Sequence, residues 1–184
     1  MPLYRNFVVE NTIDTLIVDA LKWNVSYFNL RAIKDEVYFY KLSSVALNAK
    51  DGLFTTDIAK QYITAFPDRP NGYSFNVKGA KLIDTANNLG IVFQAVTLQN
   101  EFLLKDPVKN KQALVNNYYA MMGYYNETKD LEKAIGMCDK VLELMPGEAQ
   151  TVKIKESLVK NWEIIKKMQG NQKPAADAPA ENKN

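Results

Sequence analysis

Few residues in this sequence could carry out chemistry. Its 184 residues include no histidine, which is the commonest general base and the commonest metal ligand in proteins. A Ser-His-Asp triad is therefore excluded, and the single cysteine, Cys138, cannot build a zinc site of thiolates and imidazoles within one chain. No acidic run has the spacing of a calcium loop, and the glycines do not form a phosphate-binding motif.

Carboxylate pairs are the remaining candidates for acid-base catalysis. Asp35-Glu36 and Glu127 with Asp130 lie at expected turns and helix starts, where carboxylates more simply cap helices and complement the helix dipole. Cys138 lies among apolar residues of a helical pattern, which favours a small buried hydrophobe over a reactive thiol. We therefore expect no catalytic residues, no cofactor and no metal, and predict that the chain is not an enzyme.

The composition indicates an ordinary domain with enough apolar material for a core, since 47% of residues are hydrophobic and 24% charged. The formal net charge of +2 is too small to favour nucleic acid as a partner. No stretch approaches the roughly 18 apolar residues of a membrane span. No export signal is visible, and the early start of the helical pattern suggests part of a longer protein, so cytoplasm and periplasm both stay open as its compartment.

The most informative pattern is a repeat. Pro67, Pro107 and Pro146 each close an apolar helical segment, and they are spaced 40 and 39 residues apart. Proline stops a helix because it lacks an N–H and clashes with the preceding turn. Two helical patterns in each period indicate hairpins that bury their apolar faces by stacking on neighbours. The predicted fold class is all-α, a solenoid of helical hairpins.

The clearest unit runs from about residue 115 to 147, with a polar turn at 126–130. Its apolar positions at helical spacing are Tyr118, Met121, Met122 and Tyr125 on the first helix, and Leu131, Ala134, Cys138, Val141 and Leu142 on the second. Two amphipathic helices are thus expected to face each other. Small Ala134 allows them to approach closely, and Pro146 ends the unit.

This unit resembles the tetratricopeptide repeat. In that family an aromatic residue, a large apolar pair and a second aromatic on the first helix precede an alanine, a bulky position, a small apolar position and a terminal proline. The family usually has a small residue in place of Met122 and Gly-Asp in place of Lys129-Asp130. Residues 66–73, Phe-Pro-Asp-Arg-Pro-Asn-Gly-Tyr, also look like the junction between repeats in tetratricopeptide proteins of the Bacteroidetes type.

The same register extends toward the N-terminus. It places Phe39, Leu42, Ser43 and Ala46 opposite Ala59, Tyr62, Ile63 and Phe66, and then Tyr73, Phe75, Val77 and Ala80 opposite Val92, Ala95, Phe102 and Leu103. The resemblance covers residues 36–147 and implies three repeats in a right-handed α-α superhelix. We expect a partial or degenerate helical pair at 1–35, an amphipathic capping helix at 148–169 and a disordered tail at 170–184.

The resemblance also implies where a ligand binds. In this family the first helix of each pair lines the concave face, where extended peptides or partner helices bind. First-helix residues that point away from their own second helix are expected to form this groove: Tyr40, Ser44, Ser74, Lys78, Lys81, Asn116, Tyr119 and Asn126. Aromatic, amide and cationic side chains suit an acidic or extended peptide. The alternative is that the aromatic rings simply cover adjacent repeats.

The favoured function is therefore a non-catalytic protein-protein interaction scaffold, with a protein or peptide partner whose identity the sequence leaves open. One alternative is a structural or oligomerisation segment of a larger protein, which forms a homo-oligomer through helix 148–169. Another is an accessory domain of an enzyme whose chemistry lies outside this sequence. The lysines of helix 148–169 also allow contact with a membrane surface, although Glu156 and Glu163 interrupt that face.

Overall fold

The computed structural model describes residues 34–170 together with Asp19, Lys22, Trp23, Ser26 and Leu30. But for these few residues, the expected helical pair at 1–35 and the expected tail beyond residue 170 lie outside the described residues. The continuous part of the chain contains seven α-helices: α2 (Glu36–Asn48), α3 (Gly52–Ala65), α4 (Pro70–Ile83), α5 (Ile91–Leu103), α6 (Lys111–Glu127), α7 (Leu131–Leu144) and α8 (Ala149–Gly170).

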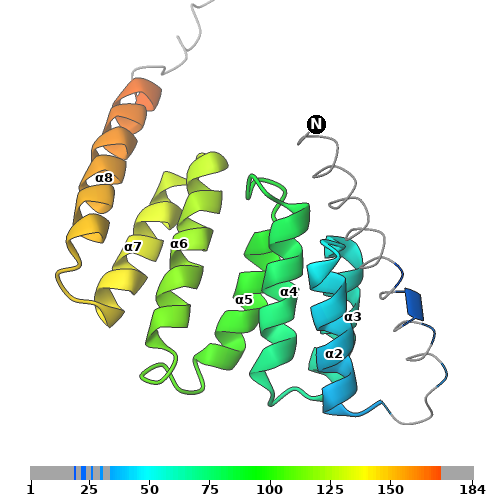
Figure 1. The fold of residues 1–184 in the computed structure, drawn as a ribbon. Helices are drawn as coiled ribbons and strands as arrows, with labels where there is room; N and C mark the ends of the chain where they lie inside the picture. Colours follow the sequence, from blue (N-terminus) through cyan, green and yellow to red (C-terminus); the bar gives the residue numbers. More distant parts are fainter. Residues whose placement is uncertain (1–18, 20–21, 24–25, 27–29, 31–33, 171–184) are drawn as a thin grey trace, which may run out of the picture.

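The helices form a row of hairpins (Figure 1). The first helices α2, α4 and α6 pair with the second helices α3, α5 and α7, and each helix contacts the next one along the chain, up to α8 against α7. Helix α2 also contacts α4, which joins the first two hairpins directly. The all-α stack of helical hairpins predicted from the sequence is confirmed.

Aromatic packing holds the first hairpin together. The rings of Phe39 and Tyr62 stack with centroids 5.5 Å apart, and Phe66 meets each of them edge-on at 6.0 Å. Tyr62 is fully buried, as is Ala59 beside it. Each such ring pair contributes roughly 0.5–1.5 kcal/mol beyond the burial of its area. The first hairpin is therefore fixed by ring geometry as well as by hydrophobicity.

Helices α3 and α4 approach each other closely because glycine faces the contact. A Cβ atom on Gly79 would lie 2.9–3.0 Å from side-chain atoms of Thr55 and Thr56 on α3. A Cβ atom on Gly72 would lie 2.9 Å from the side chain of Ile63. Real Cβ contacts are longer than this, so larger residues at these two places would push the second hairpin away from the first.

The loop between α4 and α5 is organised around the buried carboxylate of Asp84, which is only 2% exposed. One of its oxygens accepts the backbone N–H groups of Asn88 and Leu89, and the other accepts those of Ile91 and Val92. Burial alone would raise the pKa of Asp84, but these backbone donors outweigh it and lower the pKa. The carboxylate thus supplies the acceptors that the start of α5 lacks.

Two of the carboxylates singled out above, Asp35 and Asp130, act as helix caps. Asp35 accepts the backbone N–H of Tyr38 at 2.9 Å, and Asp130 accepts that of Lys133 at 3.3 Å. Glu36 instead forms an ion pair with Arg69 at 3.2 Å. The prediction that Cys138 is a buried hydrophobe is confirmed, because it is fully buried, and burial raises the pKa of its thiol.

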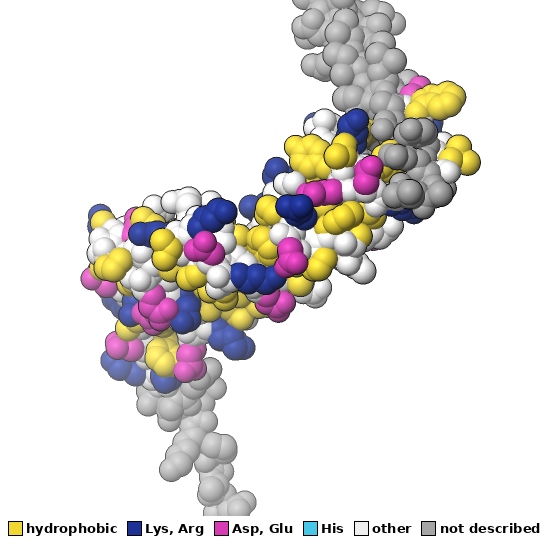
Figure 2. Space-filling view, turned by 90° about the horizontal axis from the view of Figure 1, so that it is seen from below, with side chains coloured by type: hydrophobic (Ala, Val, Ile, Leu, Met, Phe, Trp, Pro, Cys, Tyr) yellow, Lys and Arg dark blue, Asp and Glu magenta, His cyan; other side chains and the backbone are white. Residues whose placement is uncertain are grey.

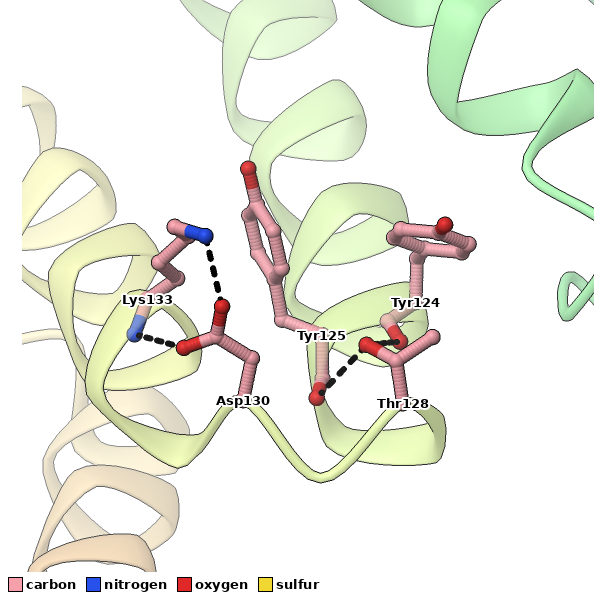
Figure 3. Close-up of polar contacts among 5 residues, drawn as sticks. All are labelled: Tyr124, Tyr125, Thr128, Asp130 and Lys133. Carbon is pink, nitrogen blue, oxygen red and sulfur yellow. Dashed lines mark hydrogen bonds and ion pairs between the residues drawn. The ribbon is translucent and has the colours of Figure 1, made fainter.

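Figure 3 shows the turn between α6 and α7. This turn contains a left-handed residue, Lys129, where the repeat family favours glycine. Lys129 has φ 63°, and Lys50 occupies the corresponding place between α2 and α3 with φ 54°. Around Lys129, the Thr128 hydroxyl donates to the carbonyl oxygen of Tyr124 at 3.0 Å, while Asp130 and Lys133 form an ion pair at 2.7 Å. These flanking bonds hold a backbone conformation that a side chain with a Cβ atom disfavours.

Replacing Lys129 with glycine is expected to stabilise the protein. The left-handed conformation costs a residue with a Cβ atom about 1–2 kcal/mol, part of which is offset by the larger unfolded-state entropy of glycine. We expect Lys129→Gly to raise the free energy of unfolding by about 1 kcal/mol in urea titrations. The control is Lys109→Gly, at an exposed turn residue without a positive φ, where the same change should be neutral or destabilising. Equal destabilisation by both substitutions would contradict the account of the turn.

Candidate interaction site

The described residues contain no cluster of His, Cys, Asp and Glu that could hold a metal ion. No helix among them combines the length and apolarity that crossing a bilayer requires. What this part of the chain does offer is two surface hollows between helices that are not adjacent in sequence.

One hollow is a groove of about 330 Å³ between α6 and α8, here called the α6–α8 groove. Met122 and Leu158 are buried in its floor, and Ile154 adds to the apolar surface. The polar side chains of Asn126, Ser157 and Asn161 also line it, and all three are exposed. No charged residue lines this groove. An apolar floor with uncharged hydrogen-bonding groups matches the chemistry of a peptide backbone with aliphatic side chains.

Tyr119 fixes the distance between α6 and α8. Its hydroxyl lies 2.5 Å from that of Thr151 and donates to a carboxylate oxygen of Glu148 at 3.0 Å. The same oxygen accepts the backbone N–H of Thr151 at 2.6 Å, so Glu148 caps the start of α8. Burial raises the pKa of Tyr119, and the hydroxyl remains a donor at neutral pH. The Tyr119 hydroxyl is therefore already hydrogen-bonded to the start of α8, and these bonds hold α6 and α8 at the distance that leaves the groove open.

Glu148 is strongly held in its ionised form. The donors of Thr151, its hydroxyl and its backbone N–H, are the main cause, with further help from Tyr119, and they lower the pKa of Glu148 from 4.5 to about 2. Because the charge also faces the N-terminal end of α8, the helix dipole favours it.

A second group of predicted residues gathers around Phe75 on the first-helix side. The half-exposed ring of Tyr40 meets Phe75 edge-on with centroids 5.4 Å apart, and the ammonium of Lys78 lies 5.8 Å from the centre of the Phe75 ring. Lys81 is exposed one turn further along α4 and has no carboxylate partner in the described part of the chain. Ser44 and Ser74 are partly buried.

The eight predicted residues therefore do not share one hollow. Tyr119 and Asn126 line the α6–α8 groove, and Tyr40 and Lys78 contact Phe75. Asn116 is exposed outside both hollows and accepts a hydrogen bond from Gln112 at 3.2 Å. The sequence pattern missed Ser157 and Asn161, because helix 148–169 was interpreted through its apolar stripe and its charged residues, without its uncharged polar ones. Their i, i+4 spacing on that helix was the available signal.

Among the described residues, the face seen in Figure 2 has no large patch of one charge. In the face seen in Figure 2, basic and acidic side chains alternate along the row of helices, with hydrophobic side chains between them. Ion pairs such as Lys105 with Asp68 and Lys155 with Asp139 account for part of this mixture. Local groups within grooves, rather than a general electrostatic field, must therefore select a ligand.

No protein-family model matches the chain, and no curated protein matches it significantly. A solved structure, described as "MamA RS-1 ArsTM double mutant", is similar in fold with a TM-score of 0.50. The match covers 96% of this chain and 97% of that one, at 13% sequence identity. MamA contains tetratricopeptide repeats. This chain has a tetratricopeptide-like helical-repeat fold. The similarity to the Bacteroidetes type stays a prediction from residues 66–73.

In this tetratricopeptide-like stack, the contribution of Glu148 to stability should depend on pH. Its folded pKa of about 2 lies below the ordinary 4.5, so the contribution is complete above pH 4.5 and is lost as pH falls toward 2. We expect Glu148→Gln to destabilise the protein at pH 7, and the difference from wild type to shrink as the pH falls from 4.5 to 2. Urea unfolding at a series of pH values measures this difference. A difference that stays constant down to pH 2 would contradict the assignment.

Proposed function

We propose that this chain is a protein-interaction scaffold without catalytic activity, and that it binds an extended peptide segment of a partner protein along its first-helix face. The repeat fold supports an interaction scaffold in general. The observation that carries the proposal of peptide binding is the α6–α8 groove. There the exposed side-chain amides of Asn126 and Asn161 line a groove whose apolar floor is formed by Met122 and Leu158.

The chemistry of this groove favours a backbone ligand over a charged small molecule. Each amide side chain offers both a donor and an acceptor, which matches the N–H and C=O groups of one residue in an extended chain. The apolar floor suits an aliphatic or aromatic side chain of the ligand, and no charge in the groove must be desolvated on binding.

Residues on α4 extend the proposed surface. Lys78 and Lys81 are exposed on the first-helix side and suit an acidic residue of the ligand, while Tyr40 adds an aromatic face beside Phe75. The backbones of helices α4, α6 and α8 do not approach one another closely, so only an extended segment can touch residues on all three of them.

Peptide selection on the purified chain tests this proposal. An octapeptide selected from a displayed library should bind the double variant Asn126→Ala/Asn161→Ala about tenfold more weakly than wild type, because two hydrogen bonds are lost. Fluorescence polarisation of the labelled peptide measures the affinity. The matched control is Gln61→Ala/Gln150→Ala, which removes two exposed amides outside the groove.

Charge provides a second arm of the same experiment. Acidic peptides should lose affinity for Lys78→Ala/Lys81→Ala, and the loss should shrink as salt is added. Lys109→Ala/Lys111→Ala removes equal charge from exposed positions outside the surface and should bind normally. Failure to select any peptide, or equal binding by the groove and control variants, contradicts peptide binding on this face.

A specific observation favours one other function, self-association through α8. The side chains of Ile154, Leu158 and Trp162 pack toward α7, but Ile164, Ile165 and Met168 are 44%, 39% and 64% exposed. Exposed apolar residues along one helix are typical of a contact surface. A second copy of the chain that packs against this part of α8 would cover them.

Sedimentation velocity tests self-association. If α8 mediates it, the sedimentation coefficient of wild type should rise with concentration, and Ile165→Asp/Met168→Asp should remain monomeric. Val108→Asp serves as a control, because Val108 is 86% exposed in the turn before α6. A wild-type monomer at every concentration argues against this function and leaves peptide binding unaffected.

A further inference from the structure

The second hollow lies on the other side of the row, between α3 and α5. It has a volume of about 400 Å³, and α4 forms its floor. Helices α3 and α5 both pack on α4 but do not contact each other, which leaves this space open. We refer to it as the α3–α5 hollow. None of the residues in the α6–α8 groove takes part in it.

The walls of the α3–α5 hollow are mainly aliphatic. Leu53 on α3, Ile83 on α4 and Leu98 on α5 line three of its sides, and the small side chain of Ala80 leaves depth at the floor. Leu53 is 70% exposed, so its side chain is open to contact with a ligand in the hollow. The volume of the α3–α5 hollow falls within the range of ligand pockets, which is roughly 300–1,000 Å³.

Asn76 is the feature that points to a ligand. It lines the hollow from α4 and is only 4% exposed, yet its side chain forms no hydrogen bond with any described residue. The other buried asparagines of the described part are paired, since Asn117 donates to the side-chain oxygen of Asn100 at 2.8 Å. No side-chain atom of Asn76 is both fully enclosed and unpaired, so its amide reaches solvent through the hollow. A ligand in the hollow can therefore take the place of water at this amide.

The rim of the α3–α5 hollow adds an acidic, a basic and an amide side chain. Asp57 and Lys60 are exposed one turn apart on α3, and neither is in an ion pair within the described part of the chain. Gln94 is exposed on α5 across the hollow. A rim with one anion, one cation and an amide does not select a ligand of one charge. It suits a peptide that carries both charges beside an aliphatic residue.

We propose that the α3–α5 hollow is a second binding site, which binds an extended peptide of a partner protein. An aliphatic side chain of this peptide lies between Leu53, Ile83 and Leu98, and its backbone pairs with the side-chain amide of Asn76. The donor and acceptor of Asn76 match the C=O and N–H of one residue in an extended chain, which point to the same side. This site is independent of the one proposed on the first-helix face, and the scaffold then holds two segments on opposite sides of the row.

A minimal probe tests the site in the full chain. N-acetyl-leucine N-methylamide contains one aliphatic side chain and two peptide groups. Titrated into isotope-labelled protein, it should produce saturable NMR shifts of the Asn76 side-chain amide and of the Ile83 and Leu98 methyl groups, with a dissociation constant on the order of 1 mM. Asn126 and Asn161 report separately on the α6–α8 groove, so failure at one site is distinguishable from failure at the other.

Two controls separate peptide recognition from simple filling of a cavity. Isopentyl alcohol carries the aliphatic group without the peptide groups and should bind at least tenfold more weakly. Asn76→Leu should fill the hollow and abolish the shifts at Ile83, whereas Asn126→Leu should leave them unchanged. If Asn76→Leu does not fold, Asn76→Ala should still weaken the peptide probe while leaving the alcohol unaffected.

The rim is tested with longer probes. One of the blocked tripeptides Lys-Leu-Glu and Glu-Leu-Lys should bind several-fold more tightly than Ala-Leu-Ala, and Asp57→Asn/Lys60→Gln should remove that preference. Absence of any shift at Asn76, or equal binding of the alcohol and the leucine probe, overturns the proposal. Tighter binding of Ala-Leu-Ala than of both charged peptides also overturns it.

Discussion

Each hairpin of this chain has more apolar surface than it can bury alone, and the whole structure depends on stacking to bury the rest. The core is accordingly a series of clusters along the row. One cluster joins Val77 and Ala80 of α4 to Val92 and Val96 of α5, with Met121 of α6 against it. The cluster at the C-terminal end joins α6, α7 and Leu158 of α8. Because every cluster bridges successive helices, the row has no single centre, and its last helix keeps apolar residues exposed.

Buried polar groups determine how the stacked units are spaced. Asp84 gathers the backbone N–H groups at the start of α5, and Asn87 in the same loop donates to the carbonyl oxygen of Ala120 on α6 at 2.7 Å. Tyr119 and Glu148 connect α6 to the start of α8 in a similar way. Hydrophobic contact is not directional, but these hydrogen bonds are. The bond between Tyr119 and Glu148 therefore helps to set the width of the α6–α8 groove.

The two hollows have related chemistry on opposite sides of the row. Each combines an aliphatic lining with amide side chains, and neither is dominated by one charge. Such surfaces suit peptide backbones and aliphatic side chains better than phosphates or nucleic acids, which need concentrated positive charge. A stack of hairpins provides this kind of surface readily, because each new hairpin adds a gap between helices without changing the core beneath it.

The sequence by itself determined the local structure. Proline spacing and apolar periodicity located the hairpins, and Asp35 and Asp130 were recognisable as caps, because helices form and end through contacts a few residues apart. Only the tertiary structure decided which exposed residues share a hollow. Asn76 lines the α3–α5 hollow without a hydrogen bond to any described residue, and the Tyr119 hydroxyl bonds between α6 and the start of α8. Both outcomes depend on the distance between helices that are not neighbours in the chain, and no local sequence pattern encodes that distance.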